Sequence, residues 1–216
     1  MANANRHPLF AREGWTHIGI AGGVAAVVHV FAGALVAAPF WAAFAFVLNF
    51  FRDPARTVPT DPKAVVCPAD GRIVALGEKD DPYRNRRSLR ISIFMNVFNV
   101  HSNRIPVAGQ VRQVWYHQGK FLNAALDKAA ESNERNAVSI RTDRGPDVVV
   151  VQVAGLIARR ILSYVQPNER VEQGQRYGFI RFGSRVDVYL PIEARPRVAL
   201  GDRVKGGSDV IAEFPS

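Results

Sequence analysis

The sequence predicts an α+β protein that is mainly β, with hydrophobic helices at its N-terminus. No Lys, Arg, Asp or Glu occurs between Glu13 and Arg52, whereas charge is frequent in the rest of the 216-residue chain. Beyond residue 60, short β-branched and aromatic runs alternate with glycine, proline and aspartate, as in strands joined by turns. A hydrophobic content of 48% is ample for a core.

The charge-free stretch is predicted to form two apolar helical segments that associate with a membrane. Residues 18–36 are long enough to cross a bilayer. Pro39 is then expected to break the run, and residues 40–51 are too short to cross alone. Arginines flank both ends of the stretch, which favours a hairpin with both ends in the cytoplasm. The alternative is a buried helical pair in a soluble core.

A proline-containing linker, residues 51–59, precedes the β body. The predicted strands are two short ones around a turn at Asp70-Gly71, and then residues 88–98, 109–117, 137–141, 147–153, 177–182 and 186–190. Residues 123–133 are predicted to be helical, and 157–165 are ambiguous. Two later segments, 170–180 and 198–211, share a Val-x-x-Gly turn before a short apolar strand. This rhythm resembles the barrel-sandwich hybrid of biotinyl and lipoyl domains, which is a likeness of fold alone.

The net charge of +9 indicates an anionic partner, either nucleic acid or a membrane surface. The chain lacks a lysine-rich tail, zinc-ligand spacing and an RNA-binding aromatic signature, so we expect no nucleic acid partner and no metal site. The single cysteine, Cys67, excludes an internal disulfide and is expected to be a small buried residue.

The dipeptide Gly183-Ser184 lies where two predicted strands meet. One interpretation is a tight hairpin, because glycine followed by serine suits a type II′ turn. The other is chemical: a serine hydroxyl beside the carbonyl of the preceding glycine can attack it and form an ester, and glycine permits the strained backbone that this needs. Elimination and hydrolysis would then leave a pyruvoyl group, whose ketone forms a Schiff base with an amine and acts as an electron sink, as PLP does elsewhere.

Six motifs follow one another along the chain: FFRDP at residues 50–54, PADGR at 68–72, NVHSNRIP at 99–106, GKFLN at 119–123, AGLIARRI at 154–161 and FGSRVDV at 182–188. Together they closely resemble the short bacterial and archaeal form of the phosphatidylserine decarboxylase proenzyme family. The resemblance runs from about residue 50 to the end, while the hydrophobic N-terminus matches in character only. It divides the chain into a membrane-associated segment, 1–50, and a pyruvoyl-dependent decarboxylase domain, 51–216.

The resemblance implies self-cleavage between Gly183 and Ser184. The products would be a β chain, residues 1–183, and an α chain, residues 184–216, that begins with a pyruvoyl group made from Ser184. The family's activity is the conversion of phosphatidylserine to phosphatidylethanolamine in phospholipid biosynthesis, through a Schiff base and without a metal or PLP. The implied partners are phosphatidylserine and an anionic membrane surface, at the cytoplasmic face of the cell membrane. The two chains would form a heterodimer, and a homodimer of this unit is left open.

The resemblance also implies roles for Asp70 and His101. In the long form, an aspartate and the second of two histidines are said to act with the serine in self-cleavage. Asp70 matches the aspartate and His101 the first histidine, but Arg104 occupies the place of the second. Histidine titrates near neutral pH, so His101 is the candidate acid or base. The plain alternatives are a turn aspartate and a loop histidine.

Four further residues are candidates for binding the substrate, namely His117, Lys120, Arg159 and Arg160. A phospholipid phosphate needs cationic or backbone donors, and arginine offers a bidentate fork. The alternative is that these side chains are ordinary solvated charges.

Two other functions remain open on the sequence alone. One is a pyruvoyl decarboxylase for a soluble amino acid, against which the charge-free N-terminal stretch argues. The other is a non-catalytic, membrane-anchored β-domain of the biotinyl or lipoyl type, which would need a lysine in a Met-Lys hairpin that this chain lacks.

Overall fold

In a computed structural model of the protein, residues 9–119, 124, 132–155, 161–181 and 183–215 are described. The chain divides into two compact units, Met1–Ala55 and Arg56–Ser216. The boundary falls inside the predicted linker, residues 51–59. The predicted helical segment at 123–133 lies almost entirely outside the described residues.

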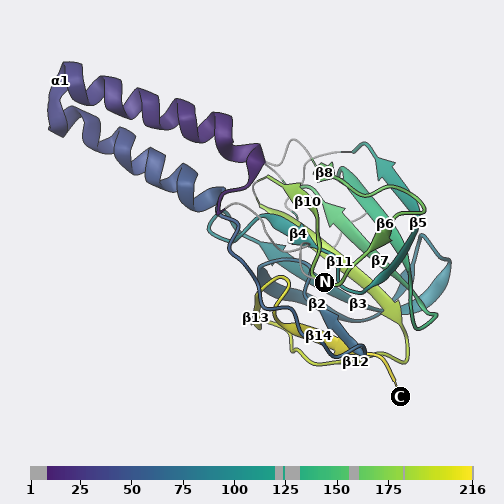
Figure 1. The fold of residues 1–216 in the computed structure, drawn as a ribbon. Helices are drawn as coiled ribbons and strands as arrows, with labels where there is room; N and C mark the ends of the chain where they lie inside the picture. Colours follow the sequence, from purple (N-terminus) through teal and green to yellow (C-terminus); the bar gives the residue numbers. More distant parts are fainter. Residues whose placement is uncertain (1–8, 120–123, 125–131, 156–160, 182, 216) are drawn as a thin grey trace. The chain divides into compact units, whose positions relative to one another are not determined.

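The first unit contains a short 3-10 helix, η1 (Arg12–Gly14), and a long apolar helix, α1 (Trp15–Phe50). α1 is folded back on itself as two antiparallel arms (Figure 1). His29 on one arm lies beside Trp41 on the other, with ring centroids 6.5 Å apart. The two-segment prediction for this stretch is therefore confirmed.

The position of the break between the arms was predicted wrongly. Pro39 lies inside the helix, and the interruption is at Gly33, whose φ is 81°. A left-handed backbone is cheap only for glycine, so the chain reverses there before it reaches the proline. Among the described residues, the helical stretch Arg12–Phe50 is the one span long and apolar enough to cross a membrane.

The second unit is built around a large antiparallel sheet, which has eight strands among the described residues. Its order is β13-β2-β3-β11-β7-β6-β5-β9 (Figure 1). The bounds in that order are Arg203–Val204, Gly71–Asp81, Arg86–Met95, Ser184–Pro191, Asp147–Val153, Arg135–Thr142, Gly109–His117 and Arg170–Val171. The prediction of a mainly β fold with hydrophobic N-terminal helices is confirmed.

Two three-stranded sheets complete the described part of the body. The first has the order β1-β14-β12, with bounds Ala64–Val66, Val210–Glu213 and Arg195–Pro196. The second has the order β4-β10-β8, with bounds Ser102–Arg104, Arg176–Ile180 and Ile161–Ser163. Because β1 pairs with β14 and β2 with β3 and β13, Asp70 does not form the turn of a hairpin. The prediction that each Val-x-x-Gly turn is followed by a short strand is confirmed. One turn lies between β9 and β10, and the other lies between β13 and β14.

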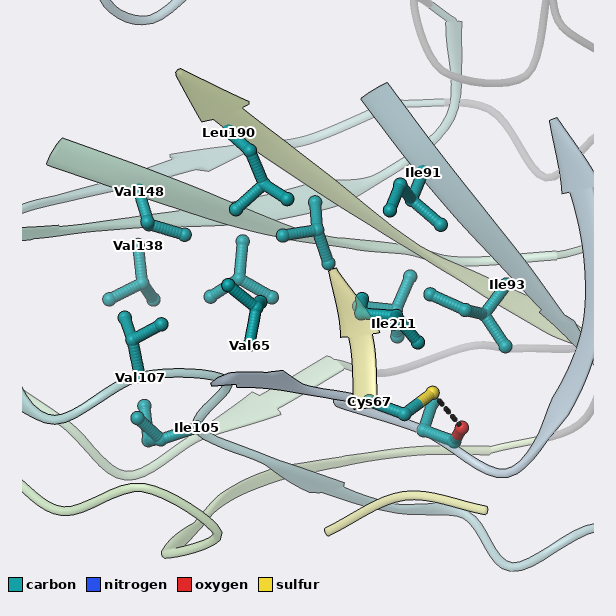
Figure 2. Close-up of a cluster of buried hydrophobic side chains, with 14 of the residues drawn as sticks. Val65, Cys67, Ile91, Ile93, Ile105, Val107, Val138, Val148, Leu190 and Ile211 are labelled. Atoms are coloured by element: carbon teal, nitrogen blue, oxygen red, sulfur yellow. Dashed lines mark hydrogen bonds between the residues drawn. The ribbon is translucent and has the colours of Figure 1, made fainter. Parts of the chain in front are cut away.

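The main core lies between one face of the large sheet and the sheet that contains β1 and β14. Figure 2 shows Val65 and Ile211 of the small sheet beside Val148 and Leu190 of the large one. Alternate residues of β11 and β7 point to the opposite face, where Val149, Val151 and Tyr189 form a second cluster. The large sheet therefore has a core face and an outer face.

Candidate active site

The Gly183-Ser184 bond lies where the chain passes from one sheet to another. β10 ends at Ile180 in the sheet with β4 and β8, and β11 begins at Ser184 between β3 and β7. Within the described part of the chain, β10 and β11 do not pair with each other, so the tight-hairpin interpretation is wrong. Gly183 has a φ of 60°, a left-handed backbone that favours glycine. A glycine-dependent bend therefore precedes the serine directly.

The hydroxyl of Ser184 is buried on the core face of the large sheet. It donates to the sulfur of Met95, its cross-strand partner, at 3.5 Å. The same sulfur accepts from Asn103 Nδ2 at 3.7 Å, and Gln152 Nε2 donates to Asn103 Oδ1 at 2.8 Å. These contacts join Ser184 to β4 and β7. None of these three neighbours was predicted from the sequence, although Gln152 stands out as a polar residue within a buried valine run.

A second glycine, Gly155, lies against the carbonyl group of Gly183. A Cβ atom built on Gly155 would overlap the Gly183 carbonyl oxygen, so only glycine fits there without a shift. Asn133 and Glu134 hold the preceding residue: Asn133 Nδ2 donates to the Ala154 carbonyl at 2.7 Å, and the Ala154 N–H donates to the Glu134 carbonyl at 2.9 Å. The carbonyl that the serine would attack is thus packed against a fixed segment of backbone.

His101 is fully buried just before β4. Its ring lies 6.2 Å from that of Phe179 in β10, and its carbonyl accepts the Ile180 N–H at 3.3 Å. Asn103, two residues further on, contacts the same sulfur as Ser184. His101 and Ser184 therefore border the same region of the core, and a catalytic role for His101 remains a prediction.

Asp70 is held by a guanidinium and a backbone donor. Arg56 Nη2 lies 2.9 and 2.8 Å from its two oxygens, and the Gly206 N–H donates to Oδ1 at 2.8 Å. Arg104, at the place of the family's second histidine, is buried and packs against Gly207, which also adjoins Arg56. The structure thus places Asp70 and Arg104 in one neighbourhood, with Arg56 as a member that the sequence analysis did not single out.

The arginine of the FGSR motif points away from Ser184. Arg185 and Asp187 alternate with the core-facing residues of β11, and both are buried at the outer face. Arg185 Nε lies 2.8 Å from Asp187 Oδ1, and Nη2 donates to Oδ2 at 2.9 Å. Asp187 therefore compensates the charge of the arginine in this motif.

Of the four predicted substrate-binding residues, His117 is the one that lies within the described ranges. His117 lines a cavity of about 590 Å³ together with Tyr83, Trp115 and Tyr189. Tyr189 belongs to the outer-face cluster, so this cavity opens on the face of the sheet opposite to the hydroxyl of Ser184. Lys120, Arg159 and Arg160 lie outside the described residues.

Cys67 is a buried structural residue, as predicted. Its thiol donates to the Ala69 carbonyl at 3.0 Å (Figure 2), and burial raises the pKa of the thiol. No group of three or more His, Cys, Asp or Glu side chains in the described ranges is arranged to hold a metal ion.

Comparison with known proteins identifies the family of the chain. A sequence model of the family "Phosphatidylserine decarboxylase" matches residues 43–212. A phosphatidylserine decarboxylase proenzyme from Paraburkholderia xenovorans is 59% identical over 208 residues, which is 96% of this chain and 98% of the relative. Another from Aromatoleum aromaticum is 59% identical over 215 residues, 100% of both chains. The chain is therefore a decarboxylase. It belongs to the phosphatidylserine decarboxylase family, as the six motifs predicted.

Proposed function

We propose that the protein cleaves itself between Gly183 and Ser184 and then converts phosphatidylserine to phosphatidylethanolamine with a pyruvoyl group made from Ser184. The names of the relatives support the proposal that the active enzyme forms from a precursor, because each relative is called a proenzyme. The observation that carries the proposal is the left-handed Gly183 immediately before a buried serine hydroxyl, at a passage between two sheets.

Self-cleavage requires the hydroxyl oxygen of Ser184 to attack the carbonyl carbon of Gly183. The C–N bond of that peptide then breaks, an ester forms, and the amine of Ser184 is released. Loss of the α proton expels the Gly183 carboxylate and leaves dehydroalanine, which takes up water and loses ammonia to become the pyruvoyl group. A strained peptide bond favours the first step, because the ester relieves the backbone constraint.

The surroundings of Ser184 fit a pyruvoyl group. The group is small, it needs no ligand set, and the residue that would form it is already fixed at the start of β11 beside Met95. Once formed, its ketone supplies an electron sink for the carbanion left by loss of CO₂. We assign the proton transfers to the buried His101 and the orientation of charge near the site to Asp70.

The first unit supplies the contact with the membrane in this proposal. Its arms carry exposed apolar side chains, among them Phe31 at 85% and Leu35 at 90% exposure. Each arm is about 26 Å long at 1.5 Å per residue, close to the thickness of a bilayer core. The arginines that flank the hairpin support a location of both ends at the cytoplasmic face.

The decisive experiment measures lipid conversion. Wild-type protein and Ser184→Ala are incubated with phosphatidylserine in mixed micelles, and phosphatidylethanolamine and CO₂ are quantified. The wild type should produce both in equal amounts, and Ser184→Ala should produce neither. Conversion by Ser184→Ala at the wild-type rate would remove the pyruvoyl group from the reaction.

A further inference from the structure

Two arginines face each other directly on neighbouring strands of the large sheet. Arg203 of β13 and Arg72 of β2 are cross-strand partners, and both are exposed. Like charges in this relationship destabilise a sheet. Lys205, two residues beyond Arg203, is also exposed. We refer to Arg72, Arg203 and Lys205 as the basic cluster. An anion bound between these side chains would relieve the repulsion between their positive charges.

The basic cluster lines a cavity of about 810 Å³. Two carboxylates, Asp70 and Asp209, also line it. Asp70 is already compensated by Arg56, with N–O distances of 2.8 and 2.9 Å. Positive charge is therefore in excess around the cavity, which suits an anionic ligand.

Two asparagines in the cavity wall add hydrogen-bond donors. Asn96 Oδ1 accepts the Phe98 N–H, and Asn99 Oδ1 accepts the Asn96 N–H, both at 2.9 Å. Because each amide oxygen is engaged with backbone, the group that each side chain can offer to a ligand is its NH₂ donor. Donors, rather than acceptors, thus face the ligand from this wall.

The cavity lies at the same level of the large sheet as the start of β11, on the outer face. Phe94 is the cross-strand partner of both Arg72 and Arg185, so these three residues form one row across β2, β3 and β11. Neighbouring strands are about 4.8 Å apart, which places the backbone of Arg72 about 10 Å from the residue that follows Ser184. The row shares its face with Arg185, so the cavity adjoins the start of β11 from the side opposite to the hydroxyl of Ser184.

We propose that Arg72, Arg203 and Lys205 form a binding site for the phosphate of a phospholipid headgroup. Phosphate is the anion that arginine binds with paired charge-assisted hydrogen bonds. Phe94 and Phe98 give the cavity an apolar wall, and Phe98 is 63% exposed, which fits a phosphate attached to lipid better than a free ion. The identity of the lipid as phosphatidylserine rests on the proposed function, whereas the phosphate chemistry does not.

A kinetic experiment tests the site in the full-length protein. Arg72→Gln/Arg203→Gln is assayed in mixed micelles over a range of phosphatidylserine mole fractions. Loss of the charge-assisted bonds should raise the half-saturating mole fraction about tenfold or more, leave kcat close to wild type, and leave self-cleavage complete. The matched control, Arg87→Gln/Arg170→Gln, removes two exposed arginines whose charged partners lie elsewhere on the sheet and should behave as wild type.

Two further outcomes of this assay distinguish a headgroup phosphate from a general attraction to an anionic surface. If the cluster only attracts an anionic surface, phosphatidylglycerol added to the micelles will restore the double variant, and this result would overturn a headgroup site. Equal half-saturation in the double variant and the control would overturn it as well.

A binding measurement separates this proposal from the proposed function. The Ser184→Ala chain needs no cleavage or turnover, and its melting temperature is measured with glycerophosphoserine and with inorganic phosphate. Glycerophosphoserine should raise the melting temperature more than inorganic phosphate does, and should have little effect when Arg72 and Arg203 are also glutamine. An unchanged response after those substitutions would exclude the site, even if the enzyme decarboxylates phosphatidylserine.

Discussion

One guanidinium nitrogen of Arg56 contacts both carboxylate oxygens of Asp70, at 2.9 and 2.8 Å. The resemblance to the long form of the family implies a histidine near this aspartate, but Arg104 occupies the place of that histidine. A guanidinium stays protonated and cannot serve as a base. We therefore propose that Asp70 acts on self-cleavage through charge and position, and that His101 acts on the substrate.

The first prediction is that Asp70→Asn and His101→Ala fail at different steps. Asp70→Asn should slow the appearance of the two fragments, because it removes the charge that Arg56 and Gly206 hold in place. His101→Ala should cleave at close to the wild-type rate but lower turnover by about a hundredfold, the usual effect of losing a general acid or base. A gel time course and CO₂ release measure the two steps.

Two results would count against this division of roles. Blocked cleavage in His101→Ala would make the histidine the base for self-processing. Normal cleavage and normal turnover in both variants would remove Asp70 and His101 from the site.

The second prediction concerns Gly155. Gly155→Ala should prevent cleavage, because its Cβ would displace the Gly183 carbonyl group from its position. Hydroxylamine cleaves esters, so its addition should release no fragments if the block precedes ester formation. Fragment yield with and without hydroxylamine, followed over time, is the measurement.

Gly109→Ala provides the matched control for Gly155→Ala. Its Cβ would overlap the Arg141 carbonyl oxygen in the pairing of β5 with β6, away from Ser184. This control should lower the melting temperature but leave self-cleavage of the folded protein intact. Cleavage of Gly155→Ala at the same rate as Gly109→Ala would show that the close approach has no role in the reaction.

The third prediction concerns stability in acid. Asp147 lies 2.6 Å from Arg84 Nη2 and 2.5 Å from Arg141 Nε. Burial raises the pKa of Asp147, but the hydrogen bond from Arg141 and the charges of Arg84, Arg141 and Arg86 together outweigh burial and hold the pKa below its ordinary value. The ionised form therefore stabilises the fold above the pKa of the unfolded chain, about 3.9. This stabilisation is lost as the pH falls through the lower pKa of the folded protein.

Asp147→Asn should lower the free energy of unfolding at pH 7 by about 1 to 3 kcal/mol, the cost of losing hydrogen bonds to a charged group. It should also flatten the dependence of that free energy on pH below about 5. Urea unfolding of the uncut Ser184→Ala chain at several pH values tests both effects. Asp80→Asn is the control, since its carboxylate is 82% exposed, and an equal pH profile for the two variants would contradict the prediction.

The fourth prediction is that the first unit holds the protein at the membrane. Deletion of residues 1–50 should move the body into the soluble fraction. Leu35→Lys, at a side chain that is 90% exposed, should weaken binding to anionic vesicles, because a charge would have to enter the hydrocarbon. Leu200→Lys on the body, 67% exposed, should not. Full-length protein that is soluble without detergent and ignores vesicles would disprove the assignment.

Much of the fold was predictable because its signals are local. The strands at 109–117 and 147–153 coincide with β5 and β7, where alternation or a valine run marks a strand directly. Pairing was less predictable: Gly-Ser suits a hairpin turn, yet β10 and β11 enter different sheets. Such pairings depend on strands that are distant in the sequence, and the identity of a dipeptide does not reveal those strands. The helix break at Gly33 was missed because Pro39 is the stronger local signal.

The proposed site could be recognised in the sequence only at residues whose chemistry stands out. Ser184, Gly183, Asp70 and His101 stand out by their chemistry. Met95 and Gly155 act through shape and close approach, which become visible only when distant segments are brought together. Asn103 and Gly155 lie inside quoted motifs, so their positions, but not their contacts, were available from the sequence.

The most direct test of the central claim is the intact mass of the purified wild-type protein under denaturing conditions. Self-cleavage predicts two polypeptides, residues 1–183 and residues 184–216, with the smaller one lighter by one ammonia than a fragment that begins with serine. Ser184→Ala should give one full-length mass. A wild-type preparation that contains only the full-length chain with an unmodified Ser184 would contradict the proposed mechanism.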